Sequence, residues 1–411
     1  MSDPFGGGFG FGFDPSRFEN APFFRELAKV MSWQGGPVNW ELASQTASTV
    51  LEEADRTASV GQELASAVPT AELWLDQVTA LPSVAGPTEP LSRSGWTQLA
   101  ATPQGLGRYV EPLAEGATEA LGQQLREQLP EALREQMGGM GGDPMQQMMG
   151  SMGAMLYGMQ AGLITGHLAG QLLATSDLGV PTVDPHRIGT VGAGADRFAE
   201  DYGVEQREMG HWLALHEAAH RRLFAGVSWL ADHVSALIRE FAAGADIDPS
   251  RLMEQLGGAG MDPSDPEALQ RALEQPDAFH VEPTPQQREV LDRLQALISF
   301  TEAWSETVVR TAAEGRLPSL PRIEEARRRQ RAEQGPGERF LSQLVGLDLT
   351  PSDVRLAGAF CEAVIEARGQ EGLDRAWEDP ECLPSRPELA DPSQWLVRMA
   401  ARELGIGPGD G

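Results

Sequence analysis

The segment HWLALHEAAHRRLFAGVSWL, residues 211–230, carries two histidines four positions apart, His216 and His220. Apolar residues recur at steps of three and four from Met209 to Phe241, which predicts helix through this region. Both histidines fall on the apolar stripe, and their spacing puts them on one helix face, within reach of one metal ion. Histidines that face the interior must be neutral and hydrogen-bonded, or bound to a cation. The pattern therefore favours a metal site over a pair of core histidines.

The residue that follows the first histidine, Glu217, completes the pattern HExxH. Histidine nitrogens bind zinc at about 2.0–2.1 Å. A carboxylate on the adjoining helix face can accept a proton from the water that zinc activates, without binding the ion itself. We therefore predict one zinc ion per chain, with Glu217 as the general base of a zinc-dependent peptidase or amidohydrolase that acts on a peptide or amide substrate.

A catalytic zinc site also needs a third protein ligand and an open fourth position. The longer pattern HExxHxxGxxH is absent, because Leu223 and Gly226 stand at its Gly and His positions. A carboxylate is then the natural completion of the ligand set. Two positions come into question: Glu240, and Glu302 in the predicted helix from Gln286 to Ala313.

Glu302 is the predicted third ligand. A carboxylate on its inward-facing stripe must be neutralised, as a zinc ion would do; the stripe is formed by Leu291, Leu294, Ile298 and Val309. Glu240 stands beside Arg239 near a helix end, which indicates a solvent-facing side chain. Glu306, one turn beyond Glu302, is predicted to orient a histidine ligand. The remaining five of the 7 histidines, with Tyr157 and Tyr202, show no pattern that assigns them a part in the chemistry.

The chain is strongly acidic, with 32 Lys and Arg against 60 Asp and Glu and a formal net charge of −28. Such a charge repels nucleic acid and anionic membrane surfaces. The concentrated basic run Arg327-Arg328-Arg329 has acidic neighbours, so it is interpreted as a solvated helix face. Cys361 and Cys382 form neither a disulfide framework nor a CxxC pair, and the start lacks a signal-peptide pattern. These features predict a cytoplasmic protein that binds no nucleic acid.

Residues 154–175, AMLYGMQAGLITGHLAGQLLAT, are apolar and carry glycines at four-residue spacing. This spacing is typical of a helix that packs closely against another. Polar residues interrupt the run and no cationic residue flanks it, which favours a buried helix over a membrane span.

Composition divides the chain into five regions, and a small sheet is predicted within the fourth, over 177–203, from its short β-capable runs. The regions are a disordered Gly/Phe-rich tail at 1–25, an N-terminal helical region at 26–136, a Met/Gly-rich connector at 137–153, a catalytic region at 154–335 and a C-terminal helical region at 336–411.

Several segments from about residue 37 onward resemble the sequences of a known protein family. They are GPVNWELA, DLGVPTVDP, ADRFAEDYGV, HWLALHEAAHRRLFAGVSWL, EAW, GLDLTPSDVRLAGAFCEAV, GLDRAWEDPECLP and ADPSQWL. Together they resemble an actinobacterial zincin-like family of zinc-dependent metalloproteases and hydrolases, some of whose members are associated with coenzyme biosynthesis. The resemblance implies a zincin-type site with His216, Glu217 and His220 in their usual roles and Glu302 at the family's Glu-x-Trp position. Ala303 departs from the glycine commonly found after that glutamate.

The fold class that follows is mainly α with a small β element (α+β), with a zincin-like metal-binding helix inside a multi-helix body. An alternative function is a non-catalytic binding or scaffold protein that retains a structural zinc site. The intact Glu217 argues against this alternative, because a structural zinc site has no use for a general base.

Overall fold

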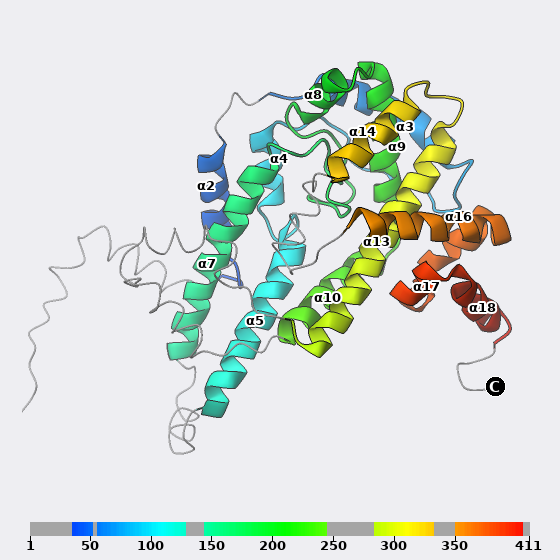
Figure 1. Ribbon diagram of the computed structural model, residues 1–411. Coiled ribbons are helices and arrows are strands. Elements are labelled where there is room, and N and C mark those ends of the chain that lie inside the picture. Colours follow the sequence, from blue (N-terminus) through cyan, green and yellow to red (C-terminus); the bar gives the residue numbers. More distant parts are fainter. Residues whose placement is uncertain (1–34, 52–55, 129–143, 245–282, 333–349, 406–411) are drawn as a thin grey trace, which may run out of the picture.

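Helices dominate the computed structural model, which describes residues 35–51, 56–128, 144–244, 283–332 and 350–405. The mainly α prediction is confirmed. Figure 1 shows α2 and α7 at one end of the molecule and α16, α17 and α18 at the other, with α9 and α13 between them. The helices are α2 Trp40–Val50, α3 Val60–Leu75, α4 Arg93–Ala100, α5 Gly107–Gln128, α7 Pro144–Leu168, α8 Gly194–Asp201, α9 Gln206–Phe224, α10 Leu230–Ala243, α13 Pro285–Ala313, α14 Leu320–Ala332, α16 Pro351–Asp374, η3 Arg375–Trp377, η4 Pro380–Cys382, α17 Arg386–Ala390 and α18 Pro392–Glu403.

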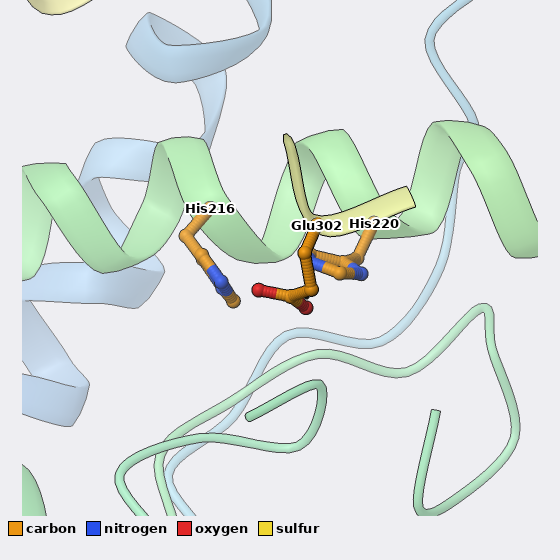
Figure 2. Close-up of side chains that lie close together, drawn as sticks. All are labelled: His216, His220 and Glu302. Atoms are coloured by element: carbon orange, nitrogen blue, oxygen red, sulfur yellow. The ribbon is translucent and has the colours of Figure 1, made fainter. Parts of the chain in front are cut away.

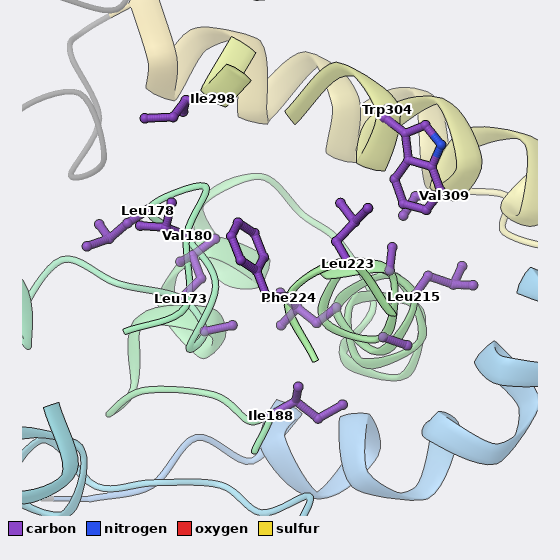
Figure 3. Close-up of a cluster of buried hydrophobic side chains, with 14 of the residues drawn as sticks. Leu173, Leu178, Val180, Ile188, Leu215, Leu223, Phe224, Ile298, Trp304 and Val309 are labelled. Carbon is purple, nitrogen blue, oxygen red and sulfur yellow. The ribbon is translucent and has the colours of Figure 1, made fainter. Parts of the chain in front are cut away.

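The helix that carries HExxH, α9, is covered on all sides from Trp212 to Phe224. It packs against α3 and α13, and its neighbours also include α8 and α10. Gly210 permits the close approach to α3, because a Cβ atom there would lie 2.9 Å from the backbone carbon of Glu63. Figure 3 shows side chains of α9, α13 and the 173–188 segment meeting in one apolar cluster. The apolar side chains of α9 therefore lie within the hydrophobic core.

Two arginines that directly follow HExxH fasten α9 to α3. Arg222, whose side chain is fully buried, donates to Glu72 from Nε at 2.9 Å and from Nη2 at 2.6 Å, and to the carbonyl oxygen of Leu81 at 2.7 Å. Arg221 donates to the other oxygen of the same carboxylate at 2.7 Å. Charge-assisted hydrogen bonds of this kind are directional. They therefore set the rotation of α9, and with it the direction in which the two histidines point.

Replacing Glu72 by alanine should lower the free energy of unfolding by about 3–5 kcal/mol, because it leaves two buried guanidinium groups without their shared carboxylate. Urea denaturation of the purified variant measures this loss. Asp76→Ala is the matched control: Asp76 also pairs with Arg222, at 2.6 Å, but its side chain is 52% exposed, so its loss should cost under about 1 kcal/mol. Equal losses for the two variants would contradict the proposed clamp.

The close helix contact predicted from the glycine spacing is confirmed between α7 and α2. A Cβ atom at Gly158 or Gly162 would lie 2.5 Å from a backbone oxygen of Asn39 or Ala43, and one at Gly166 would lie 2.7 Å from Val50 Cβ. The connector expected over 137–153 needs a correction. Helix α7 begins at Pro144, a favoured first helical residue, so the second half of that stretch is helical.

The β element expected over 177–203 takes the form of isolated bridges. A central extended segment, 188–192, accepts and donates backbone hydrogen bonds on both sides. Proline interrupts the neighbouring segment at Pro87 and Pro90, and proline has no N–H to extend a ladder. The pairs are Thr88 with Ile188 and Leu91 with Val191 in parallel, and Ala174 with Thr190 antiparallel.

None of the helices in the described ranges is long and apolar enough to cross a bilayer. Cys361 and Cys382 are free, buried thiols, and burial raises the pKa of both. Several predicted features lie outside the described residues: the tail at 1–25, the first part of the connector, part of the catalytic region at 245–282 and the start of the C-terminal region.

Candidate metal centre

Helices α9 and α13 bring His216, His220 and Glu302 together, although Glu302 comes 82 residues after His220 in the chain. One ligand atom of each residue lies within 4.8 Å of the other two. The Nε2 atom of His220 is 3.6 Å from Oε1 of Glu302. Figure 2 shows both imidazoles projecting from the same side of α9, with the Glu302 carboxylate between them. A capping box at Thr284 and a proline at the first position begin α13, which packs against α9 and carries Glu302.

The two imidazoles belong to a column of rings along one face of α9. Four-residue spacing stacks each ring on the next turn, with centroids 5.4 Å apart for Trp212 and His216, 4.6 Å for His216 and His220, and 6.3 Å for His220 and Phe224. All three candidate ligands are buried, and Glu302 is the most exposed of them at 9%. The column holds the histidine rings in place, as a preformed site requires.

Glu217 is fully buried and its carboxylate meets one turn of the chain. Thr175 Oγ1 donates to Oε2 at 2.5 Å, and Ser176 donates from its backbone N–H to Oε1 at 3.1 Å and from its hydroxyl to Oε2 at 3.3 Å. The Nδ1 atom of His216 lies 3.4 Å from Oε1. Sequence reasoning missed Thr175 and Ser176. Nothing in ATSDLG marks them, because the contact spans about forty residues of sequence.

The turn that holds Glu217 is itself held from behind. Thr182 donates to the Thr175 carbonyl from its backbone N–H at 3.0 Å and from its hydroxyl at 2.7 Å, and Trp96 Nε1 donates to the Thr182 hydroxyl at 2.8 Å. Tyr109 donates to the Pro181 carbonyl at 3.1 Å. Burial raises the pKa of the Tyr109 hydroxyl, so it stays a donor at neutral pH.

Gly179 brings the same turn against the third candidate ligand. Its φ is 77°, a left-handed conformation that suits glycine, and a Cβ atom there would lie 2.8 Å from Oε1 of Glu302. Asp177 pairs with Arg327 of α14 at 2.8 Å, and both side chains are buried. This corrects the sequence interpretation of the basic run: Arg328 and Arg329 do pair with Glu325 at the surface, but Arg327 faces inward.

Glu240, the competing candidate ligand, pairs with Arg293 at 2.5 Å, and both side chains are about half exposed. Glu306 is half-buried on α13, and its charge acts on Arg310 and on the thiol of Cys361. Its role in orienting a histidine stays a prediction.

Other histidines are engaged elsewhere. His211 stacks on Trp74 at 6.0 Å, His167 contacts the Leu163 carbonyl at 2.8 Å, His186 pairs with Asp184 at 3.0 Å and His233 meets the Trp229 ring edge-on. His280 lies outside the described residues.

The tryptophan of the Glu-x-Trp element, Trp304, is fully buried and donates from Nε1 to Asp374 at 2.9 Å. Asp374 also accepts from the Thr79 hydroxyl at 2.7 Å, from the backbone of Ala80 at 2.9 Å and from Gln370 at 2.8 Å. The motif therefore combines a candidate ligand with an anchor: Glu302 faces α9, and Trp304 ties α13 to α16 and the 79–80 segment.

The donor set fits zinc. Two imidazole nitrogens and one carboxylate oxygen, close together on rigid helices, are the ligands of hydrolytic zinc sites, and Glu217 adjoins them without being one of the three. A bound cation would also offset the free-energy cost of burying the Glu302 carboxylate between the two histidines.

The model of the zincin-like metallopeptidase family matches residues 38–396, which include the whole of this centre. The chain belongs to this family. The family resemblance inferred from the sequence is therefore confirmed at the level of zincin-like metallopeptidases.

A solved structure with the same fold comes from Chloroflexus aurantiacus, where it is described as a candidate hydrolase with a novel fold. The TM-score is 0.56 at 22% sequence identity, and the match covers 88% of this chain and 99% of that one. At this identity the likeness bears on the fold alone. No curated protein matches the chain.

Proposed function

We propose that the protein is a zinc-dependent peptidase or amidohydrolase in which His216, His220 and Glu302 hold the metal and Glu217 is the general base. The observation that carries the proposal is the convergence of the two α9 histidines with Glu302 of α13 beside a separately held glutamate. When bound, zinc supplies a Lewis acid that polarises the scissile carbonyl and makes water more acidic.

The chain's own part in the reaction is proton transfer. Oε1 of Glu217, the oxygen on the His216 side, accepts a proton from the attacking water as the water oxygen bonds to the carbonyl carbon. The same oxygen then gives that proton to the amide nitrogen as the carbon–nitrogen bond breaks. Thr175 and Ser176 keep the carboxylate oriented throughout.

A scaffold protein with a structural zinc ion is the competing function. A structural zinc ion needs no base beside its ligands. Glu217 adjoins His216 without being one of the three candidate ligands, so its position favours catalysis. The peptide substrate is proposed from the family. Cytoplasmic location, actinobacterial origin and a link to coenzyme biosynthesis stay predictions from the sequence.

The purified protein should bind about one zinc ion per chain, because the described part of the chain forms one group of three candidate ligands, at HExxH. Metal analysis after dialysis against a weak chelator tests this. A His216→Ala, His220→Ala double variant is the control and should retain none. Less than half an equivalent of zinc in the unaltered protein would contradict the proposal.

A further inference from the structure

We propose that Thr175 and Ser176 are positioning residues of the hydrolytic reaction: the turn they form sets the orientation in which Glu217 exchanges its proton. This inference rests on the proposed function, since it assigns Glu217 the role of base. It names residues outside HExxH that act on the substrate only through Glu217.

Hydrogen bonds from Thr175 and Ser176 fix the Glu217 carboxylate. The Glu217 carboxylate receives three donors from two adjacent residues, and both of its oxygens are used. The Thr175 hydroxyl contact, at 2.5 Å, is the shortest of the three. Hydrogen bonds to an ionised carboxylate are strong and directional, so they select one rotamer of a side chain with three rotatable bonds.

The turn that contains Thr175 and Ser176 is itself held by hydrogen bonds and by apolar packing. Thr182 closes it through two hydrogen bonds to the Thr175 carbonyl, and Trp96 of α4 donates to the Thr182 hydroxyl. A chain of hydrogen bonds therefore runs from α4 through Thr182 and Thr175 to Glu217. Leu178 and Val180 of the same turn enter the apolar core beside Phe224 (Figure 3). Such support is what holds a catalytic group in a productive geometry.

The Glu302 carboxylate lies next to the same turn. The same turn reaches its carboxylate at Gly179, so one short segment contacts both the proposed base and the proposed third ligand. The placement of Glu217 relative to Glu302 therefore depends on this turn. A displacement of about 1 Å in such a geometry can lower a rate by about 100-fold.

The test is the hydrolysis of a quenched fluorescent peptide library by the zinc-loaded full chain. Thr175→Val removes the hydroxyl at nearly constant volume and should lower kcat by about 10–100-fold with KM within about twofold. Thr175→Ser retains the hydroxyl and should restore kcat to within about threefold of the unaltered protein. Ser176→Ala, which removes a 3.3 Å contact, should lower kcat less than Thr175→Val.

Thr165→Val is the matched control, because Thr165 is equally buried and its hydroxyl donates within α7, at 2.6 Å to the Ala161 carbonyl. It should leave kcat unchanged, and all variants should retain zinc. An unchanged kcat in Thr175→Val, or an equal loss in Thr175→Ser, would overturn the inference.

A second measurement needs no activity. The Thr175→Val change should lower the Tm of the metal-free protein by on the order of 2–4 °C more when Glu217 is present than in a Glu217→Ala background, since the hydroxyl then has a partner to lose. Equal shifts in both backgrounds would overturn the inference. Should the protein hydrolyse no peptide, this cycle still tests the contact, so failure of the proposed function is distinguishable from failure of the positioning role.

Discussion

Glu217→Gln should lower kcat by about 10²–10⁴-fold while the protein keeps its zinc and its fold. The amide has nearly the same shape as the carboxylate but does not accept the proton of the attacking water. Glu217 is not one of the three candidate ligands, so metal content should not change. Peptide hydrolysis, metal analysis and thermal denaturation of the same preparation give the three readouts.

Glu208→Gln provides the matched control on the same helix. Glu208 is half-buried on α9 and accepts a hydrogen bond from the backbone of Ser319 at 2.6 Å, away from the centre. It should leave kcat within about twofold of the unaltered protein, as expected of a carboxylate outside the chemistry. Full activity in Glu217→Gln would refute the base assignment, and a matching loss of zinc would make Glu217 a ligand.

Glu302→Ala should weaken zinc binding by on the order of 10²–10³-fold. Structural zinc sites with four ligands bind with about 10–16 kcal/mol, so one ligand accounts for roughly 3–4 kcal/mol. The loss also leaves His220 without the carboxylate that lies 3.6 Å from its Nε2 atom. Competition with a chromophoric chelator measures the affinity directly.

Glu240→Ala distinguishes the two candidate ligands. Its carboxylate pairs with Arg293 at the surface, so its removal should change zinc affinity less than about twofold. If Glu240→Ala released the metal and Glu302→Ala retained it, the short-spaced ligand set would be correct and the assignment of Glu302 wrong.

The candidate histidine ligands and the residues that anchor α9 to α3 are neighbours in the sequence. Within α9, His216 and His220 face the candidate centre, and the two residues after His220, Arg221 and Arg222, clamp the helix to Glu72. A change in the clamp should therefore reach the centre through the rotation of α9. We expect Glu72→Ala to affect zinc affinity as well as the free energy of unfolding.

Local patterns were sufficient for the helical part of the fold. The 3.6-residue recurrence of apolar residues predicts helix from Met209 to Phe241, where the structure has two helices, α9 and α10, with a break between Phe224 and Leu230. It also predicts α13, whose bounds agree with the expected range to within one residue at its start. The glycine spacing in α7 likewise predicts a close helix contact, because the absence of Cβ atoms lets two helix backbones approach each other. Patterns of this kind act within one or two helical turns, which is why a sequence reveals them.

Composition was a poorer guide to the structure of the Met/Gly-rich stretch and of the basic run. Pro144–Gly153 is rich in Met and Gly and was expected as connector, yet it is helical as the start of α7. Arg327 shares a basic run with two exposed arginines, yet it is buried against Asp177. For Arg327, a tertiary contact overrides the local preference.

By itself, the sequence determined that a helix carries HExxH and which residues on it are the candidate ligands, since four-residue spacing on an apolar stripe follows from helix geometry alone. The sequence also favoured Glu302 over Glu240, but only the tertiary structure shows that Glu302 meets the histidines while Glu240 pairs at the surface. Only the tertiary structure shows that Thr175 and Ser176 hold Glu217. These contacts join residues that are about 40 to 80 positions apart. Their formation depends on how α13 and the 174–182 turn pack against α9, which no local pattern encodes.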